Sequence, residues 1–308
     1  MKLAAQDNID RASGRPWGAS WFRVMRALAA AFILLAALFW NIPAGIKSYS
    51  YAAIRELVKV HTILGTWHLE KLTSEHYYIK FRPEDRVEAE LVLDTAEFFY
   101  RPVTEEFNFT PRGRIPIILY SSREALNKSF GWEADESAMG VYWAGAIRVL
   151  SPGVWVEQQE AGRIAEVFKT AGPMAHELTH LVVDYLTGGN YPRWFTEGVA
   201  QYEEYKLTGF ELQDATSSLK PPFYSMRDLT GRFDQLPNQT KAYGESLAAV
   251  RFIVSYAGEP ALHQLIAELG QCLDFNQAAA KVLRLDEAQF EAGWQDWAMT
   301  KAPRRDLF

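Results

Sequence analysis

Hydrophobic residues are distributed unevenly along the chain, and their pattern divides it into three regions. Residues 27–40 form an unbroken run of 14 apolar residues, and a mostly apolar stretch continues to Ile46. The whole stretch of about 20 residues has the length of a helix that crosses a membrane. Apolar positions from 46 to 72 then recur at helical spacing, which predicts a second helix leading away from the first.

From about residue 74 the pattern changes to short strands that alternate with helices. The β-branched run at 114–120 predicts a strand that is buried on both faces. Ser121 and Glu124 form a predicted capping box for a short helix after that strand. The other elements expected in this region are a strand at 76–81, a helix at 85–107, and a strand pair or bent edge strand at 140–152.

Helical periodicity dominates the rest of the chain. The expected helices cover residues 157–171, 173–187, 193–206, 241–257, 260–270, 274–283 and 287–299. The pattern therefore predicts an α+β fold, in which a small mixed sheet with an edge strand is followed by a helical C-terminal half.

Charged residues around the apolar N-terminal run predict its orientation. The run is preceded by more basic than acidic residues: Lys2, Arg11, Arg15, Arg23 and Arg26 against Asp7 and Asp10. This excess places the N-terminus in the cytoplasm and the rest of the chain outside the membrane. Two alternatives stay open: a cleaved signal peptide that ends at a poor small-residue site at Ala44, and a buried helix of a soluble domain.

The favoured interpretation is a single-pass protein of the cell membrane with an extracytoplasmic domain. It divides the chain into a cytoplasmic tail at 1–26, a transmembrane anchor at 27–46, a juxtamembrane helix at 47–73 and a large domain at 74–308. The membrane is then one partner of the protein, through the N-terminal helix.

Composition narrows the class of protein further. With 308 residues, 48% of them hydrophobic and 14% aromatic, the chain can bury a sizeable core, which argues against disorder. The net charge of −6 and the lack of a long basic cluster disfavour a nucleic-acid partner. A single cysteine, Cys272, excludes an intrachain disulfide.

The segment GPMAHELTHLVVDYLTGG, residues 172–189, combines helix boundaries with metal-binding residues. A Gly-Pro pair starts the predicted helix and a Gly-Gly pair ends it. His176 and His180 are one turn apart and point the same way, so both imidazoles can bind one zinc ion. Glu177 lies on the adjacent flank, close to where a metal-bound water would sit, and is the candidate general base.

The next predicted helix, within 191–209, is the expected source of a third ligand. A catalytic zinc takes three protein ligands and leaves a fourth position open. Glu197 is the best candidate, and Gly198 beside it removes a side chain where two backbones approach closely, at a cost of about 1 kcal/mol in a helix. Glu203 and Glu204 are alternatives, but their positions near the helix end predict that they face solvent.

The two motifs together resemble the paired signatures of the gluzincin metallopeptidases. HELTHLVVDY and WFTEGVAQYEE are most similar to those of the bacterial membrane-linked peptidase MA-like families, and more distantly to thermolysin-type enzymes. A looser resemblance extends over residues 74–299. It implies a zincin-like fold with Zn²⁺ as the cofactor, bound by His176, His180 and Glu197, and Glu177 as the base.

The resemblance also implies a reaction, the zinc-dependent hydrolysis of a peptide or protein substrate. On this hypothesis Glu177 takes a proton from the zinc-bound water as the water attacks, and then delivers it to the leaving amine. The oxyanion needs a donor, for which Tyr243 is the first candidate and His263 the second. Tyr243 could instead be a core tyrosine with a satisfied hydroxyl. The strand region at 140–151 is expected to bind extended peptide along its edge.

Asp184 continues the series of His176 and His180 at the eighth residue after His176. Such a carboxylate can orient a ligating histidine through the ring nitrogen that does not bind the metal. The competing interpretation is an aspartate at the helix end that binds an arginine or a tryptophan.

Two other functions compete with a membrane-anchored peptidase. One is a catalytically silent, zinc-stabilised interaction domain outside the cytoplasm; Glu177 argues against it, because a structural zinc does not need that carboxylate. The other is an intramembrane protease, which is disfavoured because the zinc helix is short and is flanked by polar residues rather than by a long apolar run.

Overall fold

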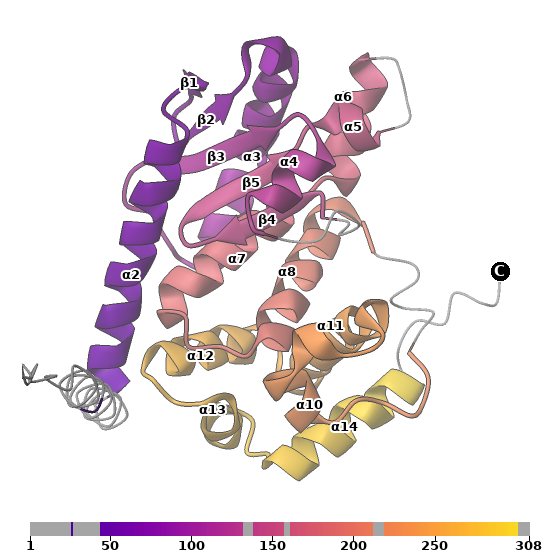
Figure 1. Cartoon of the computed structure of the whole chain (residues 1–308). Helices are drawn as coiled ribbons and strands as arrows, with labels where there is room; N and C mark the ends of the chain where they lie inside the picture. Colours follow the sequence, from indigo (N-terminus) through magenta and orange to yellow (C-terminus); the bar gives the residue numbers. More distant parts are fainter. Residues whose placement is uncertain (1–25, 27–43, 132–137, 157–160, 212–218, 301–308) are drawn as a thin grey trace, which may run out of the picture. The chain divides into compact units, whose positions relative to one another are not determined.

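The computed structural model describes residue 26 and residues 44–131, 138–156, 161–211 and 219–300 (Figure 1). The chain divides into two compact units, Met1–Lys47 and Ser48–Phe308. The predicted membrane span lies outside the described residues except at 44–46, the first residues of helix α2 (Ala44–Gly65). Among the residues that are described, no helix is long and apolar enough to cross a membrane.

A five-stranded mixed sheet forms the first half of the larger unit, with the strand order β1-β2-β3-β5-β4. Its strands are β1 (Glu70–Thr73), β2 (Tyr77–Phe81), β3 (Ile115–Tyr120), β4 (Gly140–Trp143) and β5 (Ala146–Leu150). Strands β2, β3 and β5 are parallel, and β1 and β4 pair antiparallel at the two edges. The predicted small mixed sheet with an edge strand is confirmed.

Burial separates the central strands from the edge strands. β3 is buried along nearly its whole length, as its β-branched run predicts, and Ile117 lies between Ile79 of β2 and Ile147 of β5. β4 is only partly buried and pairs with β5 in the register Gly140↔Val149. The sheet therefore ends at β4, an edge strand that is more exposed than the central strands.

The prediction that the second helix reaches residue 72 was wrong at the C-terminal end of the helix. α2 ends at Gly65, and the next residues turn into strand β1. β1 is exposed apart from Leu72, which is partly buried, so no alternating buried face marks it as a strand. Its pairing with β2, not its own hydrophobic pattern, makes it a strand.

The prediction of a capping box at Ser121 and Glu124 was also wrong, because the cap lies one residue later. Helix α4 (Arg123–Lys128) is capped by Ser122, whose hydroxyl oxygen accepts the backbone N–H of Ala125 at 3.2 Å. Ser121 instead donates its hydroxyl hydrogen to Asp85, which lies just before helix α3 (Arg86–Glu106). A tertiary partner has therefore taken the side chain that local sequence assigned to the cap.

The seven helices expected after residue 157 are all present over their described residues, within a few residues at each end. Two short helices, α5 and α10, were not expected. The helices not yet bounded are α5 (Pro152–Trp155), α6 (Ala161–Ala171), α7 (Met174–Thr187), α8 (Arg193–Thr208), α10 (Met226–Gly231), α11 (Gln239–Ala257), α12 (Glu259–Gly270), α13 (Phe275–Val282) and α14 (Glu287–Thr300). The helical C-terminal half is confirmed.

Helices α7 and α8 lie side by side at the junction between the sheet and the helical half (Figure 1). α7 packs against α3, β4, α8 and α12, and α8 packs most extensively against α11. Trp194 and Phe195 at the start of α8 are fully buried within the core. The two helices that carry the candidate ligands are therefore held from several sides.

Helices α8 and α11 approach closely at Gly198. A Cβ built on Gly198 would lie 2.3 Å from the carbonyl oxygen of Ser246 and 2.6 Å from Val250 Cγ2. The predicted close approach of two backbones is confirmed, and α11 supplies the second backbone. Gly198 follows Glu197 directly, so this contact lies one residue from a candidate ligand.

Gly198→Ala should lower the free energy of unfolding by about 2–3 kcal/mol, because a backbone carbonyl cannot move aside as a flexible side chain can. Gly162→Ala on α6 is the matched control, since nothing lies within 4 Å of a Cβ built there. That change should raise stability by about 0.5–1 kcal/mol. Urea unfolding of both variants measures the difference, and equal midpoints would show that the α8–α11 contact is not tight.

Candidate metal centre

Local sequence sets both ends of helix α7. Pro173 precedes the first helical residue, and Gly188 ends the helix in the left-handed conformation, with a φ of 62°. The chain turns tightly at Gly172, where a Cβ would lie 2.1 Å from the carbonyl oxygen of Phe168. These boundaries place His176 and His180 in the first half of the helix, on one face.

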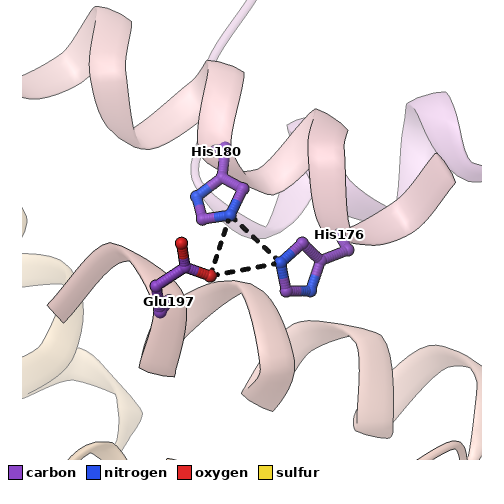
Figure 2. Close-up of side chains that lie close together, drawn as sticks. All are labelled: His176, His180 and Glu197. Atoms are coloured by element: carbon purple, nitrogen blue, oxygen red, sulfur yellow. Dashed lines mark hydrogen bonds and ion pairs between the residues drawn. The ribbon is translucent and has the colours of Figure 1, made fainter. Parts of the chain in front are cut away.

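Helix α8 brings Glu197 opposite the two imidazoles, as Figure 2 shows. The Nε2 atoms of His176 and His180 are 3.0 Å apart. Glu197 Oε2 lies 3.5 Å from the first of these nitrogens and 3.4 Å from the second. Ligand atoms of one tetrahedral zinc, at about 2.0–2.2 Å from the ion, are roughly 3.3–3.6 Å apart. The two separations to Glu197 fall within this range, the separation of the two nitrogens is about 0.3 Å shorter, and all three atoms have the chemistry of zinc ligands.

Charge and burial favour a cation between these groups. Burial lowers the pKa of His176, but hydrogen bonds to the Glu197 and Glu204 carboxylates outweigh it and raise that pKa well above its usual range. Burial raises the pKa of Glu197, yet the charge of His180 and hydrogen bonds from both imidazoles hold it far below its usual range. Glu197 is therefore ionised, which is the form that binds a metal, whereas His176 holds a proton that a metal would displace.

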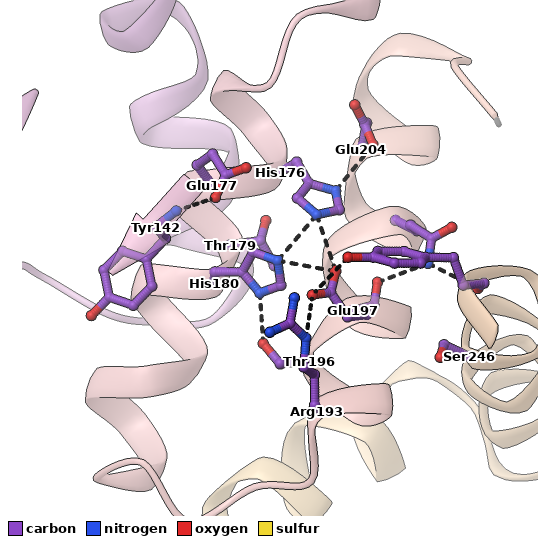
Figure 3. Close-up of polar contacts among 12 residues, drawn as sticks. Tyr142, His176, Glu177, Thr179, His180, Arg193, Thr196, Glu197, Glu204 and Ser246 are labelled. Carbon is purple, nitrogen blue, oxygen red and sulfur yellow. Dashed lines mark hydrogen bonds and ion pairs between the residues drawn. The ribbon is translucent and has the colours of Figure 1, made fainter. Parts of the chain in front are cut away.

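The ring nitrogens that point away from Glu197 have partners of their own (Figure 3). His180 Nδ1 lies 2.7 Å from Thr196 Oγ1, and His176 Nδ1 lies 3.2 Å from Glu204 Oε2. Such contacts fix the orientation of both rings and the nitrogen that is left for a metal. Thr196 was not predicted, although its position directly before Glu197 is a signal that could have indicated it.

The prediction that Glu203 and Glu204 face solvent was wrong. Their exposed fractions are 2% and 8%, because the face of α8 that carries them is packed, although Tyr205 beside them is 38% exposed. Glu204 contacts His176, whereas Glu203 contacts Lys206 at 3.3 Å. Of the two, only Glu204 has a described contact with the ligand set.

Glu204→Gln should weaken zinc binding about 10–100-fold, because His176 would lose a charged partner on its outer nitrogen. Glu203→Gln is the matched control on the same helix. Burial raises the pKa of Glu203 to about 7, so glutamine resembles its neutral form. Competition with a chelating dye measures both dissociation constants. If the two variants bind zinc equally well, Glu204 does not support the site.

Glu177 lies on the flank of α7 that faces strand β4 (Figure 3). Its side chain is 5% exposed, and its Oε2 accepts the backbone N–H of Tyr142 at 2.5 Å. Burial raises the pKa of Glu177 above its usual range. It is not one of the three converging ligands, and a raised pKa suits a group that takes up and releases a proton.

The second oxygen of Glu197 also has partners. Glu197 Oε1 lies 3.4 Å from Arg193 Nε and 3.5 Å from the Tyr243 hydroxyl. Tyr243, the predicted oxyanion donor, therefore does lie beside the ligand set, at the start of α11. Arg193 was not predicted; its place one turn before Glu197 on the same helix is the signal that was missed.

Asp184 does not orient either histidine, so the first interpretation of this residue was wrong. Eight residues beyond His176, a helix has turned roughly 80° past the starting direction and has advanced about 12 Å. Asp184 is fully buried and binds Arg55 Nη1 at 3.1 Å. The competing interpretation, an aspartate near the helix end that binds an arginine, is the one the structure bears out.

His263, the second candidate donor, pairs with α3 instead. Its Nε2 lies 3.1 Å from Glu106 Oε1, and its ring packs near Phe107. Its described contacts do not include the ligand set, since α12 approaches α7 at Gly270, where a Cβ would lie 2.5 Å from the carbonyl oxygen of Leu186. Of the two predicted oxyanion donors, Tyr243 is therefore the one with a described contact to the ligand set.

Comparison with known proteins gives the family. Residues 108–300 match the sequence profile of the Peptidase MA superfamily, which is well over half of the chain. The chain therefore belongs to the peptidase MA superfamily. The family predicted from the two motifs is confirmed.

Comparisons with curated proteins and with solved structures add less information about the family. No match was found among curated proteins. Among solved structures, the chain is similar to a mutant of a two-domain M1 zinc metallopeptidase bound to L-arginine, with a TM-score of 0.44 and 13% sequence identity. The similarity covers 77% of this chain and 53% of that one, so the chain spans about half the length of that structure.

Proposed function

We propose that this protein hydrolyses peptide bonds with a zinc ion bound by His176, His180 and Glu197. The observation that carries the proposal is the convergence of these three donor atoms at 3.0–3.5 Å from one another. Membership of a peptidase superfamily supports it. A bound zinc ion supplies a Lewis acid that polarises the scissile carbonyl and makes a water molecule more acidic.

Glu177 is the proton carrier in this proposal. It is buried beside the ligand set without belonging to it, and the N–H of Tyr142 holds one of its oxygens. The carboxylate takes a proton from the attacking water and passes it to the nitrogen of the leaving amine. Its raised pKa brings the two steps of this transfer closer in energy.

Two donors are available for the developing negative charge on the carbonyl oxygen. The Tyr243 hydroxyl is held beside Glu197, and Arg193 lies on the same side with its side chain about half exposed. The pKa of Tyr243 is raised, chiefly by the charge of Glu197, so its hydroxyl keeps its hydrogen. We assign Tyr243 the role of hydrogen-bond donor to the oxyanion.

Strand β4 is the proposed binding edge for the substrate. The Tyr142 N–H points to Glu177 rather than into the β4–β5 ladder, so alternate residues of β4 direct their backbone groups outward. Gly140 is two residues before Tyr142, so its backbone groups point the same way. An extended segment of polypeptide can pair with this edge next to the ligand set.

The location of the protein belongs to the same proposal. The apolar run at 27–46 and the basic excess before it support a single-pass anchor with the peptidase domain, 74–308, outside the cytoplasm. Cell fractionation tests this part: the protein should stay with membranes after a carbonate wash. A mature protein that begins after Ala44 and washes free would contradict the anchor.

Removal of the metal should abolish activity and its return should restore it. The full chain, treated with a chelator and dialysed, should lose cleavage of quenched fluorescent peptides, and one equivalent of zinc should recover it, because all three ligands come from the protein itself. Peptide digests analysed by mass spectrometry measure cleavage and its specificity. Stoichiometric zinc binding without cleavage of any peptide would contradict the proposed function.

A further inference from the structure

The carboxylate of Asp184 is the centre of a buried polar cluster between helices α2 and α7. It is fully buried, and its Oδ1 accepts the hydroxyl of Tyr51 at 2.7 Å. Its Oδ2 accepts the hydroxyl of Tyr142 at 2.6 Å and Nη1 of Arg55 at 3.1 Å. A charge buried this completely needs such partners, so the positions of all three are tied to Asp184.

Tyr142 connects this cluster to Glu177. Its hydroxyl donates to Asp184 and accepts the N–H of Gly145 in the turn between β4 and β5. Its backbone N–H donates to Glu177 Oε2. One residue of the edge strand therefore joins the buried aspartate near the end of α7 to the glutamate near its beginning.

Helix α2 supplies the cation of the cluster. Arg55 is 7% exposed and lies with its guanidinium carbon 3.6 Å from the centre of the Tyr185 ring. The fit is close: a Cβ on Gly189 would lie 2.4 Å from the ring of Tyr51, and one on Gly145 would lie 2.9 Å from Lys59. α2 is thus seated specifically on α7 and on the β4–β5 turn.

This helix lies outside the part of the chain that matches the peptidase MA superfamily, residues 108–300. The contact is therefore a property of this chain that the family match does not include. The same helix follows directly on the apolar run at the N-terminus. Its inner face carries Tyr51 and Arg55, and both turn towards Asp184.

We propose that Arg55, Asp184 and Tyr142 form a positioning chain through which helix α2 holds strand β4 and the carboxylate of Glu177 in register. None of the three is a catalytic residue. Asp184 holds the Tyr142 ring, the ring holds the edge strand, and the strand's N–H orients Glu177. The inference rests on the proposed function where it concerns catalysis, and on the described contacts alone where it concerns the strand.

Three variants of the full chain test the inference. Tyr142→Phe removes the hydroxyl that reaches Asp184 but keeps the backbone N–H, and Arg55→Met removes the cation. Tyr185→Phe is the matched control, because that hydroxyl contacts Glu56 and Lys59 rather than Asp184. Hydrogen exchange of the peptide that contains β4 reports on the strand, and kcat and KM on a quenched peptide report on Glu177.

Both test variants should exchange the β4 amides about tenfold faster than wild type, as expected for the loss of a buried hydrogen bond that holds a local element. Their kcat should fall by about the same factor. The double variant should be no slower than the worse single variant, because both act through Asp184.

Equal β4 exchange in Tyr142→Phe, Arg55→Met and Tyr185→Phe would overturn the inference. So would unchanged kcat in both test variants of an active enzyme. Faster β4 exchange in a chain that cleaves no peptide, even as zinc-loaded wild type, would instead support the positioning chain and refute the proposed function. The two failures are therefore distinguishable.

Discussion

Glu177→Gln should lower kcat by about 10²–10⁴-fold while the protein stays folded and keeps its metal. The substitution removes the group that accepts a proton but preserves the shape of the side chain. Glutamine can still accept the Tyr142 N–H, which the glutamate accepts at 2.5 Å. The carboxylate is not among the three converging donors, so zinc content should match that of the wild type.

Glu245→Gln is the control for this change. Glu245 is another fully buried glutamate that accepts a backbone N–H, that of Tyr224 at 3.0 Å, and it does not belong to the ligand set. Its kcat should stay within about twofold of wild type, since no proton transfer depends on it. Steady-state kinetics on one quenched peptide, with metal analysis of each variant, decide the question. Comparable kcat values for the two variants would remove Glu177 from its proposed role.

Glu197→Ala should abolish tight zinc binding. The loss of a single outer partner typically costs about 10–100-fold in metal affinity, so the loss of a direct ligand should cost more than about 100-fold. In thermal terms, zinc at 1,000 times the wild-type Kd stabilises the wild type by about 4 kcal/mol. The variant should gain about 1.4 kcal/mol or less at that concentration.

Asp234→Ala separates a ligand effect from a charge effect. Asp234 is the second carboxylate that pairs with Arg193, at 3.2 Å from Nη1, and it lies outside the ligand set. This variant should bind zinc as the wild type does. Isothermal titration of metal-free protein measures both affinities. Full zinc occupancy of Glu197→Ala would mean that another group is the third ligand.

The spacing of the two histidines in the sequence was enough to predict that they share a site. Residues four apart on a helix share a face whatever the rest of the chain does, so the spacing of His176 and His180 already implied a shared ligand site. Gly198 carried information of the same kind, since a glycine inside a helix requires a packing reason. The 2.3 Å approach of Ser246 O to its missing Cβ is that reason.

The contacts of Asp184 and Glu204 could not be predicted from local sequence. Asp184 looked like a continuation of the histidine face, yet its partner Arg55 is 129 residues away in the sequence. Glu204 looked solvent-facing near a helix end, but the packing of α8 buries it beside His176. In both cases the side chain's role depends on which distant element covers it, and no local period encodes that.

By itself, then, the sequence determined most of the long helices, the central strands and the superfamily. It also determined the residues whose geometry depends on a single helix or on two helices joined by a short loop. Only the tertiary structure decided how α2 contacts α7, which nitrogen of each histidine is left for a metal, and how Tyr142 joins Asp184 to Glu177. The physical reason is the separation along the sequence between the residues that interact. Helical spacing is fixed by backbone hydrogen bonds a few residues apart, whereas the partners of a buried charge are chosen by the whole packed chain.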